Sequence, residues 1–356
     1  MDKMFKRTLL GAAVSMAAIS GSANAAVQLA GDAVQFYGQA AGFMIWGDDS
    51  DTQSTGAVME SRVGFRGVVE FEDFSPKFIW QIEGGNADNG SKSGQLGARD
   101  TYLGFDFDGV GQFKYGRQLV AAYNYVDWPH SNPGLGNVFD WNNDLGVSFQ
   151  DRADNVFRYD SANWGGFGLQ ATLSGMEQDT ERLVSSVAAS FSKDLFSVHA
   201  GYYHRGEFNS KEDEKSKYII DDNGNVVANP DFVEGGAEVK NYSHNYAIVG
   251  GSLFLGDLTL TAAYKAMETD SEDGTVDQNA YSATAQYIID GKWVLKAGYA
   301  GTDDAKGTSD TSDTAVTARL GYLLPSAYMY VDSRNYKMND ASDWSNYVLV
   351  GMEYYF

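Results

Sequence analysis

Two arginines on one face of a predicted strand are the residues best placed to act on charged solutes. Arg62 and Arg66 are four positions apart, and because side chains alternate across a strand, both share the face that carries Gly64. The other face is apolar and carries Val63, Phe65 and Val69. An arginine that faces lipid at mid-membrane costs about 2–4 kcal/mol, so in a membrane-spanning strand the charged face borders water. Like charges repel, and this pair therefore requires counter-charges or water nearby.

The sequence shows no pattern that predicts catalysis, a metal or a cofactor. There are no cysteines, and no ligand-like spacing joins the four histidines, which are His130, His199, His204 and His244. The segment Asp221–Asn225 has calcium-loop residue types but lacks the loop spacing and the closing glutamate, so we interpret it as a solvated loop. The net charge of −22 opposes binding to nucleic acid. We therefore expect no catalytic site, no metal, no cofactor and no nucleic acid partner.

Alternating polarity indicates strands along the chain after residue 25. In Tyr281–Ile289 the odd positions are aromatic or small and apolar, whereas Ser282, Thr284 and Gln286 are polar. The same alternation recurs in residues 292–299 and 316–322. A polar face opposite an aromatic and apolar face suits a wall with water on one side and lipid on the other.

The connections between these strands alternate between short and long. Seven short turns lie near residues 73–76, 108–110, 163–166, 193–195, 256–257, 290–291 and 324–326. Eight longer polar loops lie near residues 47–55, 87–96, 119–148, 176–181, 207–240, 269–277, 302–312 and 337–343. These counts predict a sixteen-stranded antiparallel transmembrane β-barrel, since bacterial outer-membrane barrels have even strand numbers with short turns at one end. A water-soluble β-sandwich is the alternative, but it would rarely need sixteen strands.

The first 25 residues are predicted to be a cleaved secretory signal. A basic start precedes an apolar run from Leu9 to Ile19, and Ala23-Asn24-Ala25 matches the small-x-small cleavage rule. An N-terminal membrane anchor is the alternative, but the run is shorter than the ~20 residues that a spanning helix needs. The barrel domain is then expected to occupy residues 26–356.

Three blocks of sequence resemble the general diffusion porins of Gram-negative bacteria, particularly the vibrio-type branch. They are ESRVGFRG at 60–67, RDTYLGF with VGQFKYGRQ at 99–105 and 110–118, and GMEYYF at 351–356. The resemblance covers essentially the whole chain. It implies a homotrimer of barrels in the outer membrane, with the third outer loop folded into each lumen. The terminal block also implies a signal for the barrel-assembly machinery, carried by Gly351, Tyr354 and Phe356.

The same resemblance implies a charged pore constriction. Its basic wall would consist of Arg62, Arg66, Arg99 and Arg152, facing a loop at about residues 119–146. Many relatives carry a Pro-Glu-Phe-Gly-Gly motif in this loop, whereas this chain has Asn132-Pro133-Gly134-Leu135-Gly136. Because that glutamate is missing, the acidic side is expected at Asp127, Asp140 or Asp144. The alternative is that the arginines pair with wall carboxylates and anchor the loop.

We therefore expect a channel for passive diffusion of ions and small hydrophilic solutes, in contact with outer-membrane lipids and lipopolysaccharide. The acidic chain and loops predict a modest cation preference, although the four arginines act in the opposite sense. Three other functions stay open. They are a substrate-specific channel, for example for oligosaccharides, an adhesin or phage receptor acting through residues 207–238, and a hydrolase whose site is assembled from distant residues.

Overall fold

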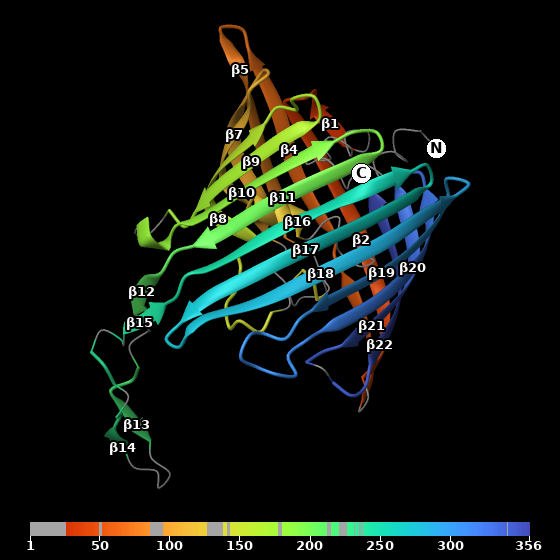
Figure 1. The fold of residues 1–356 in the computed structure, drawn as a ribbon. Helices are drawn as coiled ribbons and strands as arrows, with labels where there is room; N and C mark the ends of the chain where they lie inside the picture. Colours follow the sequence, from red (N-terminus) through yellow and green to blue (C-terminus); the bar gives the residue numbers. More distant parts are fainter. Residues whose placement is uncertain are drawn as a thin grey trace.

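The computed structural model describes residues 26–49, 52–85, 95–126, 138–140, 143–176, 180–211, 215–220, 226–230, 232–234, 236, 238–339 and 341–356. The predicted secretory signal, residues 1–25, lies outside the described residues. Within these ranges, no helix is long and apolar enough to cross a membrane. The described residues are mostly antiparallel strands, and these strands form one barrel (Figure 1).

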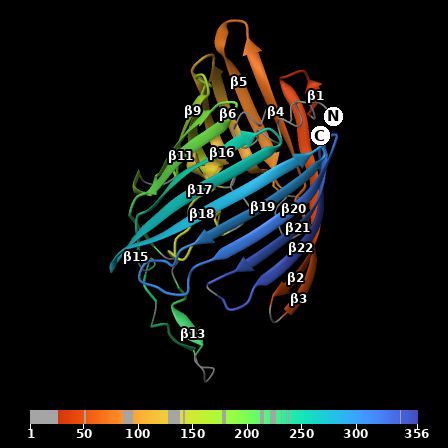
Figure 2. The same ribbon diagram turned by 45° about the vertical axis from the view of Figure 1, so that its right-hand side comes forward.

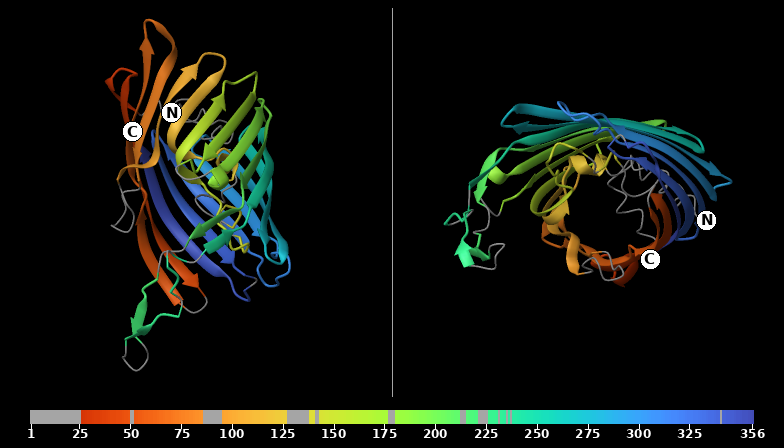
Figure 3. Two further views of the ribbon diagram at one scale, coloured as in Figure 1. Left: turned by 90° about the vertical axis from the view of Figure 1, so that its left-hand side faces the viewer. Right: turned by 90° about the horizontal axis from the view of Figure 1, so that it is seen from below.

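Sixteen barrel strands follow one another around a closed ring. In chain order they are β2 (Val34–Asp49), β3 with β4 (Thr52–Met59 and Arg62–Phe71), β5 (Phe74–Gly84), β6 (Leu96–Phe107), β7 (Gly111–Leu119), β8 (Arg152–Ser161), β9 (Phe167–Ser174), β10 (Val184–Ser192), β11 (Phe196–Arg205), β16 (His244–Leu255), β17 (Leu258–Ser271), β18 (Gly274–Ile289), β19 (Trp293–Thr302), β20 (Thr314–Leu324), β21 (Ala327–Lys337) and β22 (Ser345–Tyr355). Each pairs antiparallel with the next, and β22 pairs with β2 (Figure 3). Closure leaves no unpaired sheet edge in lipid. The predicted sixteen-stranded barrel is confirmed.

Strands β3 and β4 are two parts of one barrel strand. β2 pairs with β3 along Gly42–Asp49 and with β4 along Gln35–Gln39. At the break, the Ser61 hydroxyl accepts a hydrogen bond from the Ala41 amide at 3.0 Å, so a side chain replaces one bond of the backbone ladder. The short strand β1 (Val27–Ala30) pairs with the start of β2.

The seven predicted short turns all connect strands at the end of the barrel that is uppermost in Figure 1. At the opposite end, which we call the outer rim, two of the predicted long loops are instead tight hairpins. β2 and β3 pair as far as Asp49 and Thr52, and β17 and β18 pair as far as Ser271 and Gly274. The expectation of long loops near 47–55 and 269–277 was therefore wrong. The polar residues there mark strands that leave the membrane, because backbone pairing does not require apolar side chains once a strand extends into water.

The two faces of the barrel wall differ in polarity as predicted. On the outside, Tyr287, Trp293 and Leu295 are between 43% and 46% exposed in the isolated chain. On the inside, Ser282 and Thr284 alternate with these apolar positions and are buried. This alternation lets each strand present hydrocarbon to lipid and polar groups to the interior.

The main buried cluster lies inside the barrel, around the loop that we call L3 (residues 120–151). The described parts of L3 are residues 120–126, 138–140 and 143–151, and they include the short helix η2 (Ala122–Tyr125). Val120, Val138 and Phe139 are fully buried against the inner faces of the wall strands β10 to β20. L3 therefore folds into the lumen, as the resemblance implied.

The connection between β11 and β16 carries two small hairpins. β12 (Phe208–Lys211) pairs with β15 (Glu238–Asn241), and β13 (Tyr218–Ile220) pairs with β14 (Val226–Ala228). The second hairpin hangs away from the outer rim (Figures 1 and 2). The connection between β9 and β10 contains the short helix η3 (Thr180–Arg182).

Candidate pore constriction

Two of the predicted wall arginines share one carboxylate inside the barrel. Arg99 Nε lies 2.6 Å from Glu83 Oε1, and Arg62 Nε lies 4.0 Å from the same oxygen. The Tyr37 hydroxyl donates to Glu83 Oε2 at 2.8 Å. Because Glu83 is only 9% exposed, little water reaches its carboxylate, and these three groups stabilise its charge instead. The arrangement is a cation–anion–cation triad that the sequence did not predict, since Glu83 was not identified.

An irregular bulge in β6 is what brings Arg99 inside. Strict alternation places residue 99 on the face of Leu103, which points outward and is 60% exposed. Between β5 and β6, however, the partners change from Ile82 with Thr101 to Gly84 with Leu96, so β6 contains extra residues. Gly97, with a φ of +89°, supplies a backbone conformation that other residues rarely adopt. The bulge reverses the direction of the Arg99 side chain.

The other two predicted arginines extend this basic wall. Arg66 Nε donates to Gln35 Oε1 at 3.2 Å, and its guanidinium lies 4.9 Å from the centre of the Tyr37 ring. Arg152 Nε lies 2.7 Å from Oδ1 of Asp100, the residue that follows Arg99 in the sequence. The structure thus places the four arginines on alternate strands along one side of the barrel, β4, β6 and β8. Ion pairs with Glu83 and Asp100 hold three of them, Arg62, Arg99 and Arg152.

The predicted acidic residues of L3 have different positions. Asp127 lies outside the described residues. Asp140 sits beside β17, where Lys265 Nζ donates to the carbonyls of Phe139 and Asp140 at 2.5 and 3.1 Å. The backbone amide of Asp144 donates to Gln278 Oε1 on β18 at 2.8 Å. In the ring of sixteen strands, β17 and β18 lie across the lumen from β4 and β6.

Wall side chains hold the rest of L3 by hydrogen bonds to its backbone. The amides of Ala121 and Ala122 donate to Thr172 Oγ1 on β9 and Ser186 Oγ on β10, at 3.0 and 2.9 Å. The backbone amide of Gln150 donates to the Tyr203 hydroxyl at 3.2 Å. Sequence reasoning missed these anchors. Their only local signal is a polar residue on the inner face of a strand, which every barrel strand carries.

Further charged groups line the wall away from the triad. On β20 and β21, Asp332 binds both Arg319 and Arg334, with nearest distances of 2.6 and 2.8 Å. Lys296 on β19 is the cross-strand neighbour of Arg319. On β7 and β8, Asp160 forms ion pairs with Lys114 and Arg158. Alternation alone places Lys296 and Arg319 on the polar face, but it does not indicate which carboxylates they meet. Among the described residues, no group of three or more His, Asp or Glu is arranged to hold a metal ion.

The predicted assembly residues lie on the closing strand. Gly351 packs against the ring of Tyr330, and a Cβ atom at this glycine would lie 2.4 Å from Tyr330 Cζ. Tyr354 is 49% exposed on the outside of the barrel. Phe356 exchanges backbone hydrogen bonds with Gly38 on β2, at 2.8 and 3.1 Å. The end of the chain is therefore part of the seam that closes the barrel.

Comparisons with known proteins place this architecture among bacterial channels. A family model described as Gram-negative porin matches residues 12–341. The chitoporin of Vibrio furnissii is 32% identical over 383 aligned residues, which span all of both chains. A solved structure of a loop-deletion mutant of OmpT from Vibrio cholerae has a TM-score of 0.68 at 21% identity, covering 91% of this chain and 99% of that one. An anion-selective porin from Comamonas acidovorans has a TM-score of 0.69 at 17% identity, with the same coverage. The two solved structures establish a shared fold.

Proposed function

This chain belongs to the Gram-negative porin family, and from that premise we propose that its arginine wall and loop L3 form the narrowest part of its pore. The chain is an outer-membrane channel for the passive diffusion of ions and small hydrophilic solutes. A porin conducts through its barrel, so the loop that occupies the lumen sets the free cross-section. L3 lies inside the barrel and packs along its inner wall.

The observation that carries this proposal is the position of the Arg62–Glu83–Arg99 triad relative to L3. The triad lies on β4 to β6, and the backbone of Asp140 and Asp144 is bound to β17 and β18 on the far side of the ring. Excess positive charge on one side and carboxylates on the other produce an electric field across the pore. Small polar ions pass through such a field, whereas apolar solutes must displace oriented water.

Single-channel recordings of the purified protein in planar bilayers test the proposal. We expect ohmic conductance in the wild type, and we expect Arg99→Gln to shift the zero-current potential in a salt gradient towards cations. The control variant is Lys193→Gln. Lys193 lies in the short turn between β10 and β11, where it donates to the Gly165 carbonyl, whereas the triad lies on β4, β5 and β6. An unchanged zero-current potential in Arg99→Gln would show that residue 99 does not line the constriction.

We also propose a modest cation preference. Exposed carboxylates gather on the β17–β18 hairpin at the outer rim, where they are Glu268, Asp270, Glu272 and Asp273. They raise the local concentration of cations at the pore mouth, while the arginines of the constriction oppose the passage of cations. The two contributions leave a small net preference. A clearly anion-selective zero-current potential in the wild type would contradict this proposal.

The assembly proposed here is a homotrimer, embedded among outer-membrane lipids and lipopolysaccharide after export by a signal of residues 1–25. A solved OmpT of Vibrio cholerae is described as a trimer form, which supports the proposal by analogy of fold. Gly351, Tyr354 and Phe356 are proposed to be read by the barrel-assembly machinery. Conductance steps that arrive in threes, and a mature protein that begins at Ala26, are the expected results. Family members are channels, and we propose that this chain has no catalytic activity.

A substrate-specific sugar channel is the second candidate. Tyrosines on β2, β21 and β22 point inward and are only partly buried, namely Tyr37, Tyr336, Tyr347 and Tyr355. The rings of Tyr336 and Tyr347 lie 6.0 Å apart and are tilted by 59° to each other, so they form one aromatic patch on the inner wall against which a sugar ring can pack. The relative from Vibrio furnissii is named a chitoporin. Reversible block of single-channel current by N-acetylglucosamine oligomers, weakened in Tyr347→Ala, would favour this candidate over general diffusion.

A further inference from the structure

L3 leaves the barrel wall through a tightly packed corner. Strand β7 ends at Leu119, and the first three residues of L3, Val120 to Ala122, are 0% exposed. The Val120 amide donates to the carbonyl of Asp151, the last residue of L3, at 2.9 Å, so the two ends of the loop meet here. We call residues 119–122 the entry corner. A chain that leaves a sheet loses its ladder partners, and its buried backbone groups need replacements.

Side chains supply the replacements at the entry corner. Two wall hydroxyls bind its last two amides, as described above. Asn124 Nδ2 donates to the carbonyls of Val120 and Ala121 at 3.2 and 3.3 Å. The Leu119 carbonyl accepts a hydrogen bond from Arg158 Nη1 at 3.0 Å. Arg158 lies on β8, so this bond ties the start of L3 to the neighbouring strand by a charged donor.

Asp160 fixes the direction of the Arg158 side chain. Arg158 Nε donates to both carboxylate oxygens of Asp160, at 2.9 and 3.0 Å, and Lys114 Nζ forms an ion pair with the same carboxylate. Arg158 and Lys114 are 5% and 6% exposed, so little water competes for these bonds. A guanidinium is planar and rigid, and holding its Nε edge therefore also sets where Nη1 points. Asp160 thus acts on the entry corner through Arg158.

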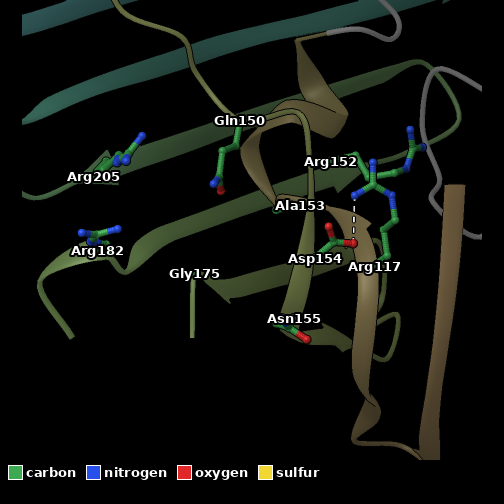
Figure 4. Close-up of a pocket in the computed structure, with 9 residues that line it drawn as sticks. All are labelled: Arg117, Gln150, Arg152, Ala153, Asp154, Asn155, Gly175, Arg182 and Arg205. Carbon is green, nitrogen blue, oxygen red and sulfur yellow. Dashed lines mark hydrogen bonds and ion pairs between the residues drawn. The ribbon is translucent and has the colours of Figure 1, made fainter. Parts of the chain in front are cut away.

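The other end of L3 is packed less closely. Gln150 Oε1 accepts a hydrogen bond from Ser174 Oγ at 2.8 Å, but Gln150 and Arg152 also line a cavity of about 450 Å³. Figure 4 shows the Gln150 side chain beside the start of β8, at Arg152 and Ala153. A segment that borders a cavity shifts at a lower packing cost than a fully buried one. The entry corner is therefore the end of L3 that fixes its position.

We propose that Asp160 is a positioning residue of the pore. By holding Arg158 on the Leu119 carbonyl, it fixes where L3 enters the lumen and how much of the cross-section L3 leaves open. Asp160 lies at the short-turn end of β8, whereas Arg152 of the arginine wall begins that strand. A carboxylate away from the constriction thus sets its width. This inference rests on the proposed function, in which L3 forms the narrowest part of the pore.

Single-channel recordings at 1 M salt test the inference, because charges are largely screened there and the conductance reports the free cross-section. The variants are Asp160→Asn and Arg158→Leu, of which the second leaves Asp160 paired with Lys114. Loss of one charge-assisted hydrogen bond should raise the time spent in states of larger conductance roughly 10- to 100-fold. Asp160→Glu retains the carboxylate and should stay close to the wild type. The matched control is Asp332→Asn, which removes a buried carboxylate that binds two arginines on β20 and β21 and should leave this current unchanged.

A reversible lock separates the position of L3 from the stability of the barrel. A Cβ atom on Gly201 would lie 3.0 Å from Ala122 Cβ, so Gly201→Cys with Ala122→Cys brings two thiols within reach of a disulfide in a chain that has no other cysteine. In Asp160→Asn, oxidation of this pair should restore the wild-type current, and reduction should release L3 again. A general loss of barrel stability would not respond to the lock. Heat-modifiable migration in gels selects the folded variants, and either the Asp160 or the Arg158 variant suffices.

Conductance that stays at the wild-type level in Asp160→Asn and Arg158→Leu would overturn the inference. Altered conductance that the oxidised lock does not restore would also overturn it. Gln278→Ala, which releases the Asp144 amide from β18, distinguishes this failure from that of the proposed function. If only Gln278→Ala alters the current, the inference fails and the proposed constriction stands. If none of the three variants alters the current, both fail.

Discussion

Neutralising Glu83 is predicted to shift the ion selectivity of the constriction towards anions. The carboxylate is 9% exposed and is the shared partner of Arg62 and Arg99, so Glu83→Gln leaves two guanidinium groups facing each other without a counter-charge. An ion that passes about 6 Å from this position gains or loses roughly 0.7 kcal/mol in water, and screening at 0.1 M salt reduces this to about 0.4 kcal/mol. The anion-to-cation permeability ratio should therefore rise about three- to fourfold.

The assay is the zero-current potential of single channels in a tenfold salt gradient, repeated at 1 M salt, where screening should abolish most of the shift. The double variant Glu83→Gln with Arg99→Gln restores the balance of charge and should return the ratio close to that of the wild type. Gln112→Ala, next to a short turn, serves as a control for loss of an interior polar side chain. A ratio that stays constant in Glu83→Gln, with a folded barrel, would refute the reasoning that places this triad beside the ion path.

Other variants test how L3 and the seam are held. Gln278→Ala removes the Oε1 atom that accepts from the Asp144 amide and the Nε2 atom that donates to the Asp303 carbonyl, both at 2.8 Å. The loss should weaken L3 docking by about 1–3 kcal/mol, which would be seen as noisier current with larger openings. Unchanged current noise would count against this anchor. Gly351→Ala places a Cβ 2.4 Å from Tyr330 Cζ and should destabilise the barrel by about 1–3 kcal/mol, measured as a lower temperature of heat-modifiable migration. Gly56→Ala, whose nearest neighbour is 3.4 Å away, should be close to neutral, and an equal loss in both variants would contradict the packing argument.

The barrel itself was predictable because its signals are local in sequence. Alternation along Tyr281–Ile289 and the short turns identify strands and their number without knowledge of partners, since period two is a property of the strand. The hairpins at Asp49 and Ser271 were misjudged for the same reason. A polar tip can be a loop or a strand in water, and only cross-strand pairing distinguishes them.

The candidate site was predictable only in part because it depends on contacts between distant strands. Arg62 and Arg66 follow from alternation, whereas the direction of Arg99 depends on a bulge whose register is set by β5. Glu83 acquires its role from two arginines on neighbouring strands. The positions of Asp140 and Asp144 depend on Lys265 and Gln278, more than 100 residues later in the chain. No periodicity within one segment carries that information.

Arg99 points into the lumen opposite L3, although alternation directs residue 99 to the outside. The chain has no cysteine, so a single introduced thiol is the only reactive one. The most direct measurement is single-channel current before and after a bulky, positively charged thiol reagent is added to Arg99→Cys and to Leu103→Cys, whose native leucine is 60% exposed on the outer face. We expect a stepwise fall in current for position 99 and no change for position 103. Current that falls only for position 103, or for neither position, would contradict it.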